Sequence, residues 1–244
     1  MRLVSWNILH GGGKRAPQII DQLERWNPDI VGLTEFCGTQ PSQEIASALT
    51  ELGLVHQEST VSPDSPKRNS LLLASRWPLE AHEPQDIPDP RSWLHVSVES
   101  ANPLSLVLFC VPNRDKNGTS YQFHDAVVDL LRPLAGTRTL AFGDTNTGVP
   151  GIDEEARFFN EREGKWFKTL ADTGWTDLWR DRNPDAREFT WYNHASGAGF
   201  RLDQLFSTGM TDQIVRDVRY DWGTPPVGKL RGPSDHAAIV IDLL

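Results

Sequence analysis

The amino-acid sequence predicts one α/β domain over residues 1–244, with two β-sheets packed face to face and helices on the outside. Three observations lead to this prediction. Strand-like segments outnumber helix-like ones, the two kinds are mixed along the chain, and no repeat or long low-complexity linker separates one part from another. The Pro-rich stretch from Glu83 to Pro90 is short and indicates a connection between strands.

The predicted strands are short apolar runs bounded by Gly, Pro, Asn or Asp. They cover residues 3–6, 30–33, 70–74, 95–98, 104–111, 139–142, 204–207, 214–220 and 238–243. Helical periodicity fits residues 17–26, 42–52, 121–131 and 154–170. Pro17 suits a first helical turn and Asn27-Pro28 should end that helix, while Ser42 and Asp153 are the expected caps of two others.

Composition limits the class of protein. The chain has 38% apolar residues and nine Trp, enough for a sizeable core, and no stretch reaches the apolar length of a membrane span. It begins without the charged leader and apolar core of a secretory signal. The two cysteines, Cys37 and Cys110, make no disulfide framework. We therefore expect a cytoplasmic protein with two small buried thiols, and a monomer by default.

The net charge of −9 argues against strong non-specific binding to nucleic acid, which relies on Lys and Arg. It does not exclude a nuclease, because part of the negative charge can belong to a metal-holding active site. Basic runs occur in predicted loops at residues 14–15, 67–68, 114–116 and 229–231. Each run is either a solvated loop or a contact for phosphate, and the sequence leaves both interpretations open.

Polar motifs stand where predicted buried strands meet loops, the places where catalytic groups tend to lie. They are Trp6-Asn7, Glu35 after the second strand, Gly143-Asp144-Thr145-Asn146, Arg201-Leu202-Asp203 and Ser234-Asp235-His236. Carboxylates, amides and one imidazole suit a hard cation and acid/base chemistry. This set predicts hydrolysis of phosphate esters with Mg²⁺, or with Mn²⁺.

Three residues are the candidate metal ligands. Glu35 is the strongest, because a carboxylate directly after a buried strand needs a partner. The amide oxygen of Asn7 can complete the metal shell, hold Glu35 or hold a bound water. Asp235 can bind the metal directly or through water, or it can cap a turn beside Ser234.

Two further pairs are the candidate catalytic groups. Asp144 and Asn146 are two residues apart, so in an extended backbone they point to one side. Asp203 is expected to accept a hydrogen bond from His236, fixing the imidazole tautomer and raising its pKa. His236 then either stabilises charge on the phosphate or acts as a general base.

The order of these motifs from Met1 to Leu244 resembles the endonuclease/exonuclease/phosphatase superfamily. Val111-Pro112-Asn113 and the segment from Gly199 to Asp203 are similar to its exonuclease III and abasic-endonuclease branch. The resemblance implies a four-layer α/β sandwich of the DNase I type. The motif residues would meet along one edge, where strand ends of the two sheets converge.

The resemblance also implies roles. Asp144 would position or deprotonate the attacking water, Asn146 would bind phosphate or steady the nucleophile, and Asn113 would approach the phosphate. The branch builds an apolar pocket for a base-less sugar at the positions of three residues of this chain: Trp191, Phe200 and Leu202. Core packing explains Trp191 and Phe200 equally well.

The sequence departs from that branch at three places. Cys110 occupies the position of a Tyr that approaches phosphate, and a thiol is the poorer donor. Phe36-Cys37 stands where the branch commonly has Thr-Lys, so a phosphate-holding cation is absent there. The segment between Asn7 and Lys14 lacks an extra Asp.

The leading hypothesis is a Mg²⁺-dependent phosphodiester hydrolase, a nuclease that acts on DNA by water attack on phosphate. The alternative is a phosphatase or phosphodiesterase of nucleotides, phospholipid headgroups or other small phosphoesters, which the acidic charge and the departures favour. A non-catalytic binding module on the same fold ranks below both, because the core set of catalytic groups is present.

Overall fold

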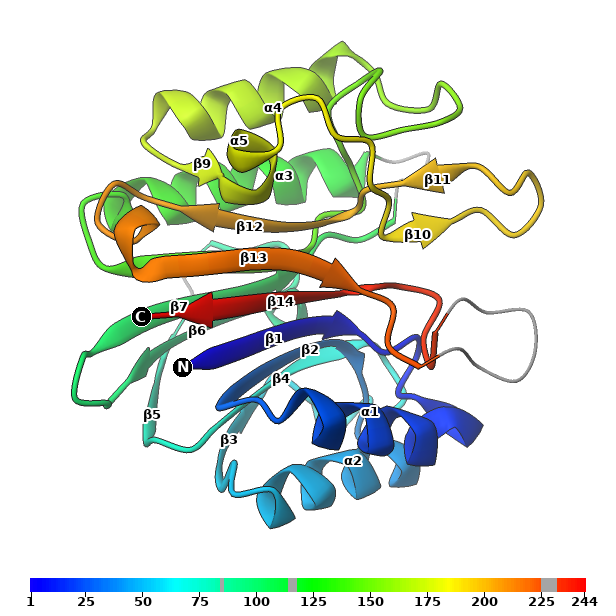
Figure 1. Cartoon of the computed structure of the whole chain (residues 1–244), viewed down its shortest axis with the longest axis vertical. Helices are drawn as coiled ribbons and strands as arrows, with labels where there is room; N and C mark the ends of the chain where they lie inside the picture. Colours follow the sequence, from blue (N-terminus) through cyan, green and yellow to red (C-terminus); the bar gives the residue numbers. More distant parts are fainter. Residues whose placement is uncertain (84–85, 114–117, 225–231) are drawn as a thin grey trace.

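The computed structural model describes residues 1–83, 86–113, 118–224 and 232–244. In these ranges two six-stranded β-sheets pack face to face, and helices cover the outer face of each sheet (Figure 1). The strand order is β13-β14-β1-β2-β4-β3 in the first sheet and β5-β6-β7-β8-β12-β9 in the second. This four-layer arrangement confirms the predicted fold class.

The first sheet is antiparallel except for the β1–β2 pair, and α1 and α2 cover it. Its elements are β1 (Arg2–Asn7), α1 (Ala16–Trp26), β2 (Ile30–Phe36), α2 (Gln40–Glu51), β3 (His56–Ser59), β4 (Ser70–Ser75), β13 (Val215–Asp221) and β14 (Ala238–Leu243). Helix α1 buries Ile19, Leu23 and Trp26 against the sheet. It ends at Asn27, which is left-handed with φ 46° and precedes Pro28.

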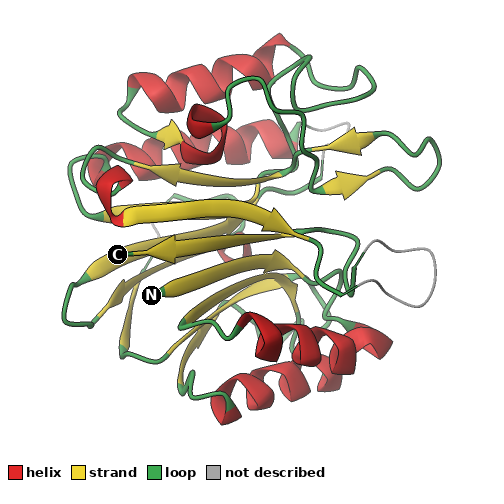
Figure 2. Cartoon of the chain, in the orientation of Figure 1, coloured by secondary structure: helices red, strands yellow, loops and turns green. Residues whose placement is uncertain are grey.

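The second sheet is antiparallel except for the β7–β8 pair, and α3 and α4 lie on its outer face (Figure 2). Its elements are β5 (Leu79–His82), β6 (Trp93–Val98), β7 (Leu104–Cys110), α3 (Thr119–Leu131), β8 (Thr139–Asp144), α4 (Glu161–Asp172), β9 (Thr176–Asp177), α5 (Leu178–Arg182) and β12 (Asp203–Ser207). A two-stranded hairpin, β10 (Trp191–Tyr192) with β11 (Gly199–Phe200), stands apart from both sheets. Short 3₁₀ turns cover Gly13–Arg15, Pro90–Ser92, Arg132–Leu134 and Asp212–Ile214.

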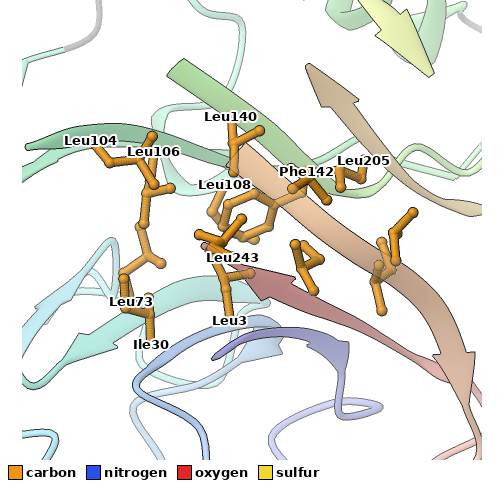
Figure 3. Packing of buried hydrophobic residues seen from close by; sticks show 14 of the residues in the cluster. Leu3, Ile30, Leu73, Leu104, Leu106, Leu108, Leu140, Phe142, Leu205 and Leu243 are labelled. Carbon is orange, nitrogen blue, oxygen red and sulfur yellow. The ribbon is translucent and has the colours of Figure 1, made fainter. Parts of the chain in front are cut away.

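The main core lies between the two sheets (Figure 3). Leu3 and Ile30 of the first sheet pack in one cluster with Leu108 and Phe142 of the second, and all four are fully buried. Truncating one of these leucines to Ala would cost about 2–5 kcal/mol, because the lost burial and the cavity left behind add together. This rigid sandwich holds the strand ends that carry the polar motifs.

The structure corrects two of the expected helix starts. Helix α4 begins at Glu161, not at residue 154, because Asn160 accepts from the Arg162 N–H group and Glu163 accepts from the Asn160 N–H group. Helix α2 begins at Gln40 after Thr39, so Ser42 is not its cap. The other predicted strands and helices agree with the structure to within about three residues at each end. The sequence did not predict α5 or the strands β3, β5, β9, β10 and β11.

Two further expectations concern the thiols and the membrane. Cys37 is buried, as expected, but Cys110 is half-buried. The Cys110 prediction was wrong because β7 ends at this residue, where the side chain lines a surface cavity. Among the described residues, no helix combines the length and the apolar character that crossing a membrane requires.

Candidate active site

The polar motifs converge at one edge of the sandwich. Asn7 and Asp144 end their strands there, and Asp203, which begins β12, pairs in register with Asp144. A cavity of ≈ 310 Å³ opens at this edge. Nine of the predicted site residues line it: Glu35, Asn113, Asp144, Asn146, Trp191, Phe200, Leu202, Asp235 and His236. The other two, Asn7 and Asp203, are buried and connect to the lining residues through hydrogen bonds.

Asn7 links two carboxylates. Its Nδ2 atom donates to Asp144 Oδ2 at 2.9 Å and lies 3.3 Å from Glu35 Oε1, while its Oδ1 atom accepts from the Leu9 N–H group. The amide nitrogen, not the oxygen expected from the sequence, therefore faces Glu35. This geometry favours a role in holding Glu35 over direct metal ligation by Asn7.

Glu35 lies near the end of β2, where the pairing with β4 is irregular and the backbone is strained. It has φ 55°, a conformation that non-glycine residues rarely adopt, and Leu9 and His10 opposite it have φ 52° and 49°. The His10 N–H group donates to Glu35 Oε2 at 2.7 Å. Strain of this kind, of order 1–3 kcal/mol per residue, persists where the surroundings fix a functional geometry. This end of β2 thus presents the Glu35 carboxylate at the cavity wall.

Asp144 is buried and its position depends on a glycine. Gly143 has φ 140°, and a Cβ atom there would lie 1.9 Å from the Phe109 carbonyl oxygen. Only glycine therefore brings Asp144 to the end of β8. Asp144 Oδ1 accepts from the Asn146 N–H group at 2.9 Å, and the Asn146 side chain donates to the Val111 carbonyl oxygen at 2.7 Å.

Asp203 and His236 form a hydrogen-bonded pair, with Asp203 Oδ2 2.9 Å from His236 Nδ1. Burial lowers the pKa of His236, but the charge and hydrogen bond of Asp203 outweigh it and raise the pKa to about 10. Burial raises the pKa of Asp144 to about 7; the charge of His236 opposes this shift, and Asp203 adds to it. The roles of Asp144 and His236 remain predictions.

The donor set suits a divalent cation. One oxygen of Asp144, one of Asp203 and a nitrogen of His236 lie within 4.8 Å of one another. Oxygen ligands and a buried carboxylate with a raised pKa are what a hard cation offsets. Because Asp203 and His236 already pair with each other, we expect the carboxylates of Glu35 and Asp235, which line the same cavity, to offer the more available oxygens.

Asp235 lies on the far wall of the cavity. Its Oδ2 atom accepts from Trp191 Nε1 at 3.2 Å, and its Oδ1 atom is 3.4 Å from the Ser234 hydroxyl. Arg15, from one of the predicted basic runs, is half-buried and donates to the carbonyl oxygens of Ile8, Leu9 and Pro233. Arg15 therefore ties the site loops together. The basic runs at 114–116 and 229–231 lie outside the described residues.

An apolar wall faces these polar groups. Phe200 and Leu202 are buried and form a small cluster with Phe159, against which Trp191 packs. Trp191 and Phe200 lie on the paired strands β10 and β11, with ring centroids 5.9 Å apart. These aromatics both pack together and line the cavity, and their contact with a base-less sugar stays a prediction.

Sequence reasoning missed three cavity residues: Leu9, Phe158 and Asn193. Phe158 is 53% exposed although it is a large apolar side chain. Its ring meets that of Phe200 edge to face at 5.8 Å. The doublet Phe158-Phe159 was assigned to a helix, and recognising the Asn160 cap would have placed both residues in the preceding loop.

The sequence profile of the Endonuclease/Exonuclease/phosphatase family matches residues 4–236, which include all eleven predicted site residues. The chain belongs to this family. Endonucleases, exonucleases and phosphatases all hydrolyse phosphoesters, so the chain is a hydrolytic enzyme of this class. No curated protein sequence matches the chain.

Solved structures share the fold. The 3′-5′ exonuclease NExo from Neisseria meningitidis is 23% identical with a TM-score of 0.81, over 100% of this chain and 99% of that one. An AP endonuclease from Archaeoglobus fulgidus is 20% identical with a TM-score of 0.82 and the same coverage. The 3′ phosphatase NExo from Neisseria, bound to a product DNA hairpin, is 22% identical with a TM-score of 0.80, again over 100% and 99%. At these identities the likeness establishes the fold.

Proposed function

We propose that the protein is a Mg²⁺-dependent phosphodiester hydrolase that acts on DNA by water attack on phosphate. One observation carries the proposal. A single cavity places Asp144 and His236 opposite an apolar wall of Trp191, Phe200 and Leu202. Acid/base groups beside an apolar pocket suit a phosphate ester attached to a sugar that has left the base stack.

Three side chains of this site have separate roles at the water and the phosphate. Asp144 accepts the proton of the attacking water, since a pKa of about 7 makes it a competent base near neutral pH. Asn146, fixed by the Val111 carbonyl oxygen and the Asp144 carboxylate, steadies that water or a phosphate oxygen. Asn113 reaches the phosphate from the loop after β7.

His236 stabilises charge and does not act as the base. Its pKa of about 10 keeps the imidazole protonated at neutral pH, and its Nδ1 atom is held by Asp203. The Nε2 atom is then left to donate to an oxygen of the phosphate as negative charge develops there. Asp203 orients the ring and balances its charge.

Glu35 and Asp235 would hold the cation, with Asn7 keeping Glu35 in place. A bound divalent cation would polarise a phosphate oxygen and offset the carboxylate charge. Mg²⁺ suits this oxygen set because it needs few protein ligands, and Mn²⁺ is the expected substitute.

A second candidate function is hydrolysis of small phosphoesters, such as nucleotides or phospholipid headgroups. Cys110 and the net charge of −9 favour it. Both candidates use the same catalytic groups and differ in what lies beyond the scissile phosphate.

The test is incision of three end-labelled duplexes, each assayed with Mg²⁺ and with chelator. One carries an abasic-site analogue, one is intact, and one ends in a 3′-phosphate. Metal-dependent cleavage of a phosphodiester bond in any duplex supports the proposal, and the products separate endonuclease from exonuclease activity. Release of the 3′-phosphate alone would instead show a phosphomonoesterase that acts on DNA. Turnover of nucleotides or phospholipids without action on any duplex would favour the second candidate.

A further inference from the structure

A second cavity adjoins the catalytic one. It has a volume of ≈ 380 Å³ and shares Glu35, Asn113 and Asn146 with the first. These three residues therefore form the boundary between the cavities, at the place where the scissile phosphate is proposed to sit. A chain that continues past this phosphate can enter the second cavity.

The second cavity carries cations on its wall. Lys67 and Arg68, both exposed, line it together with Arg91. Arg91 is paired with Asp89 at 2.8 Å, so its charge is balanced. Within the described ranges neither Lys67 nor Arg68 makes a salt bridge, which leaves two positive charges to meet an anion.

The loop that carries Lys67 and Arg68 is hydrogen-bonded to the segment that follows Glu35. Cys37 stands where the abasic-endonuclease branch commonly has a lysine, two positions after Glu35. Its Sγ atom donates to the Lys67 carbonyl oxygen at 3.7 Å, and the Gly38 N–H group donates to the Pro66 carbonyl oxygen at 2.6 Å. The loop is thereby positioned next to Glu35.

A second connection runs through Asn69. Its Oδ1 atom lies 2.8 Å from His10 Nδ1, and the His10 N–H group holds Glu35. The basic loop and the candidate metal ligand are therefore parts of one hydrogen-bonded unit. The cation missing after Glu35 in the sequence is thus supplied in space by another loop.

We propose that Lys67 and Arg68 form a subsite for a backbone phosphate of a nucleic acid, the one next to the scissile phosphate. This inference rests on the proposed function and narrows its substrate: a phosphoester with a single phosphate leaves the subsite empty. Charge-assisted contacts to a neighbouring phosphate contribute affinity without reading sequence.

The test combines protein variants with modified substrates. Lys67→Gln and Arg68→Gln remove the charges. Lys165→Gln, on an exposed position of α4, and Arg132→Gln, on an exposed position of the 3₁₀ turn after α3, are matched controls. Substrates are single-stranded oligonucleotides with a normal phosphate or an uncharged methylphosphonate on either side of the scissile phosphate. KM is measured with Mg²⁺, and binding is measured by fluorescence anisotropy in chelator at several salt concentrations.

Each subsite variant is expected to raise KM and Kd roughly three- to tenfold for the all-phosphate strand. The salt dependence of binding should become shallower by about 0.7 for each phosphate that the variant no longer neutralises. When the methylphosphonate replaces the phosphate that the subsite binds, on one side of the scissile phosphate, the wild type and the variant should have equal KM and Kd values. The control variants should change neither quantity.

Two results overturn the inference and are distinct from failure of the proposed function. Unchanged KM and Kd in both subsite variants would show that the loop does not meet phosphate. An equal loss on all methylphosphonate strands would show a long-range charge effect without a subsite. If the wild-type protein bound oligonucleotides through these residues but hydrolysed neither the single strands nor the three duplexes, the proposed function alone would fail.

Discussion

Asn7 donates a hydrogen bond to Asp144 at 2.9 Å, although 137 residues separate them in the chain. The same amide nitrogen lies 3.3 Å from Glu35. A neutral donor thus lies between two carboxylates, one near the end of β2 in the first sheet and one at the end of β8 in the second. Its hydrogen bonds hold the oxygens of the two carboxylates near each other.

The first prediction concerns Asn7→Asp. A third carboxylate beside Asp144 and Glu35 replaces attraction by repulsion, so the fold should lose about 1–3 kcal/mol in chelator. At about 2–4 °C per kcal/mol for a chain of this size, Tm should fall measurably. Millimolar Mg²⁺ should restore part of the loss.

Thermal unfolding with and without Mg²⁺ checks this, with Asn102→Asp on an exposed turn as the control. An Asn7→Asp protein with wild-type Tm in chelator would contradict the role assigned to Asn7.

The second prediction is the pH profile. Activity should rise as Asp144 loses its proton near pH 7 and fall as His236 loses its proton near pH 10. A bound cation should move the acid limb to lower pH. In Asp203→Asn the imidazolium loses its counter-charge, so the alkaline limb should move down toward the ordinary His value of about 6.5.

The same pair makes a prediction for stability. The folded pKa of His236 lies above its unfolded value, so its contribution is full below about pH 6.5 and is lost as pH rises through about 10. Urea unfolding of wild-type protein and Asp203→Asn between pH 6 and pH 10 measures it. The difference in free energy of unfolding between the two proteins should shrink as pH rises, and a difference that grew with pH would contradict the prediction.

The third prediction concerns the buried pair beneath the site. Arg201 is fully buried and bonds both oxygens of Asp153, at 2.7 and 2.9 Å. Asp153→Asn should cost about 3–5 kcal/mol, because a charge is left partly uncompensated in the interior. Asp172→Asn, which breaks only the exposed pair with Lys168, should cost about 0–1 kcal/mol.

Acid should remove the Asp153 contribution. Burial raises the pKa of Asp153, but Arg201 outweighs it and holds the pKa below its ordinary value. The contribution is therefore present above about pH 4 and is lost as pH falls through the folded pKa. Equal urea midpoints for Asp153→Asn and Asp172→Asn at pH 7 would refute this account.

The fourth prediction concerns Phe158. Its exposed ring stands at the mouth of the cavity, so Phe158→Ala should raise KM for nucleic acid about 5- to 100-fold if a base stacks there. Phe158→Trp should retain binding. Stability should change little, because the side chain is 53% exposed.

Steady-state kinetics on oligonucleotides checks this prediction, with Met210→Ala as an exposed apolar control at the opposite end of β12. Equal KM values for Phe158→Ala and wild type would remove Phe158 from the substrate path.

The main strands could be predicted because buried strands appear as clear apolar runs. The candidate site residues could be predicted because the polar motifs stand beside these runs. The start of α4 could not, since Glu154 to Phe159 fit helical periodicity while the Asn160 cap decides the boundary. Strand β3 carries His56, Gln57 and Glu58 and lies at a sheet edge, so its sequence contains no apolar run from which a strand could be predicted.

The directions of side chains could not be predicted from the sequence either. The sequence placed Asn7 and Glu35 together, but it could not show which end of the amide faces Glu35, because the Leu9 N–H group decides this. Nor could it show that residues 67–68 lie beside Glu35, since that proximity depends on hydrogen bonds from Cys37 and Gly38.

The central claim is that Asp144 activates water for phosphodiester hydrolysis in DNA. Its most direct test is single-turnover cleavage of an end-labelled duplex with an abasic-site analogue, by wild type and Asp144→Asn in Mg²⁺. We expect cleavage by wild type, none in chelator, and a loss of about 10²–10⁴-fold in the variant. The variant should fold at least as stably above pH 7, because burial disfavours the carboxylate. Near wild-type cleavage by a folded Asp144→Asn protein would contradict the account.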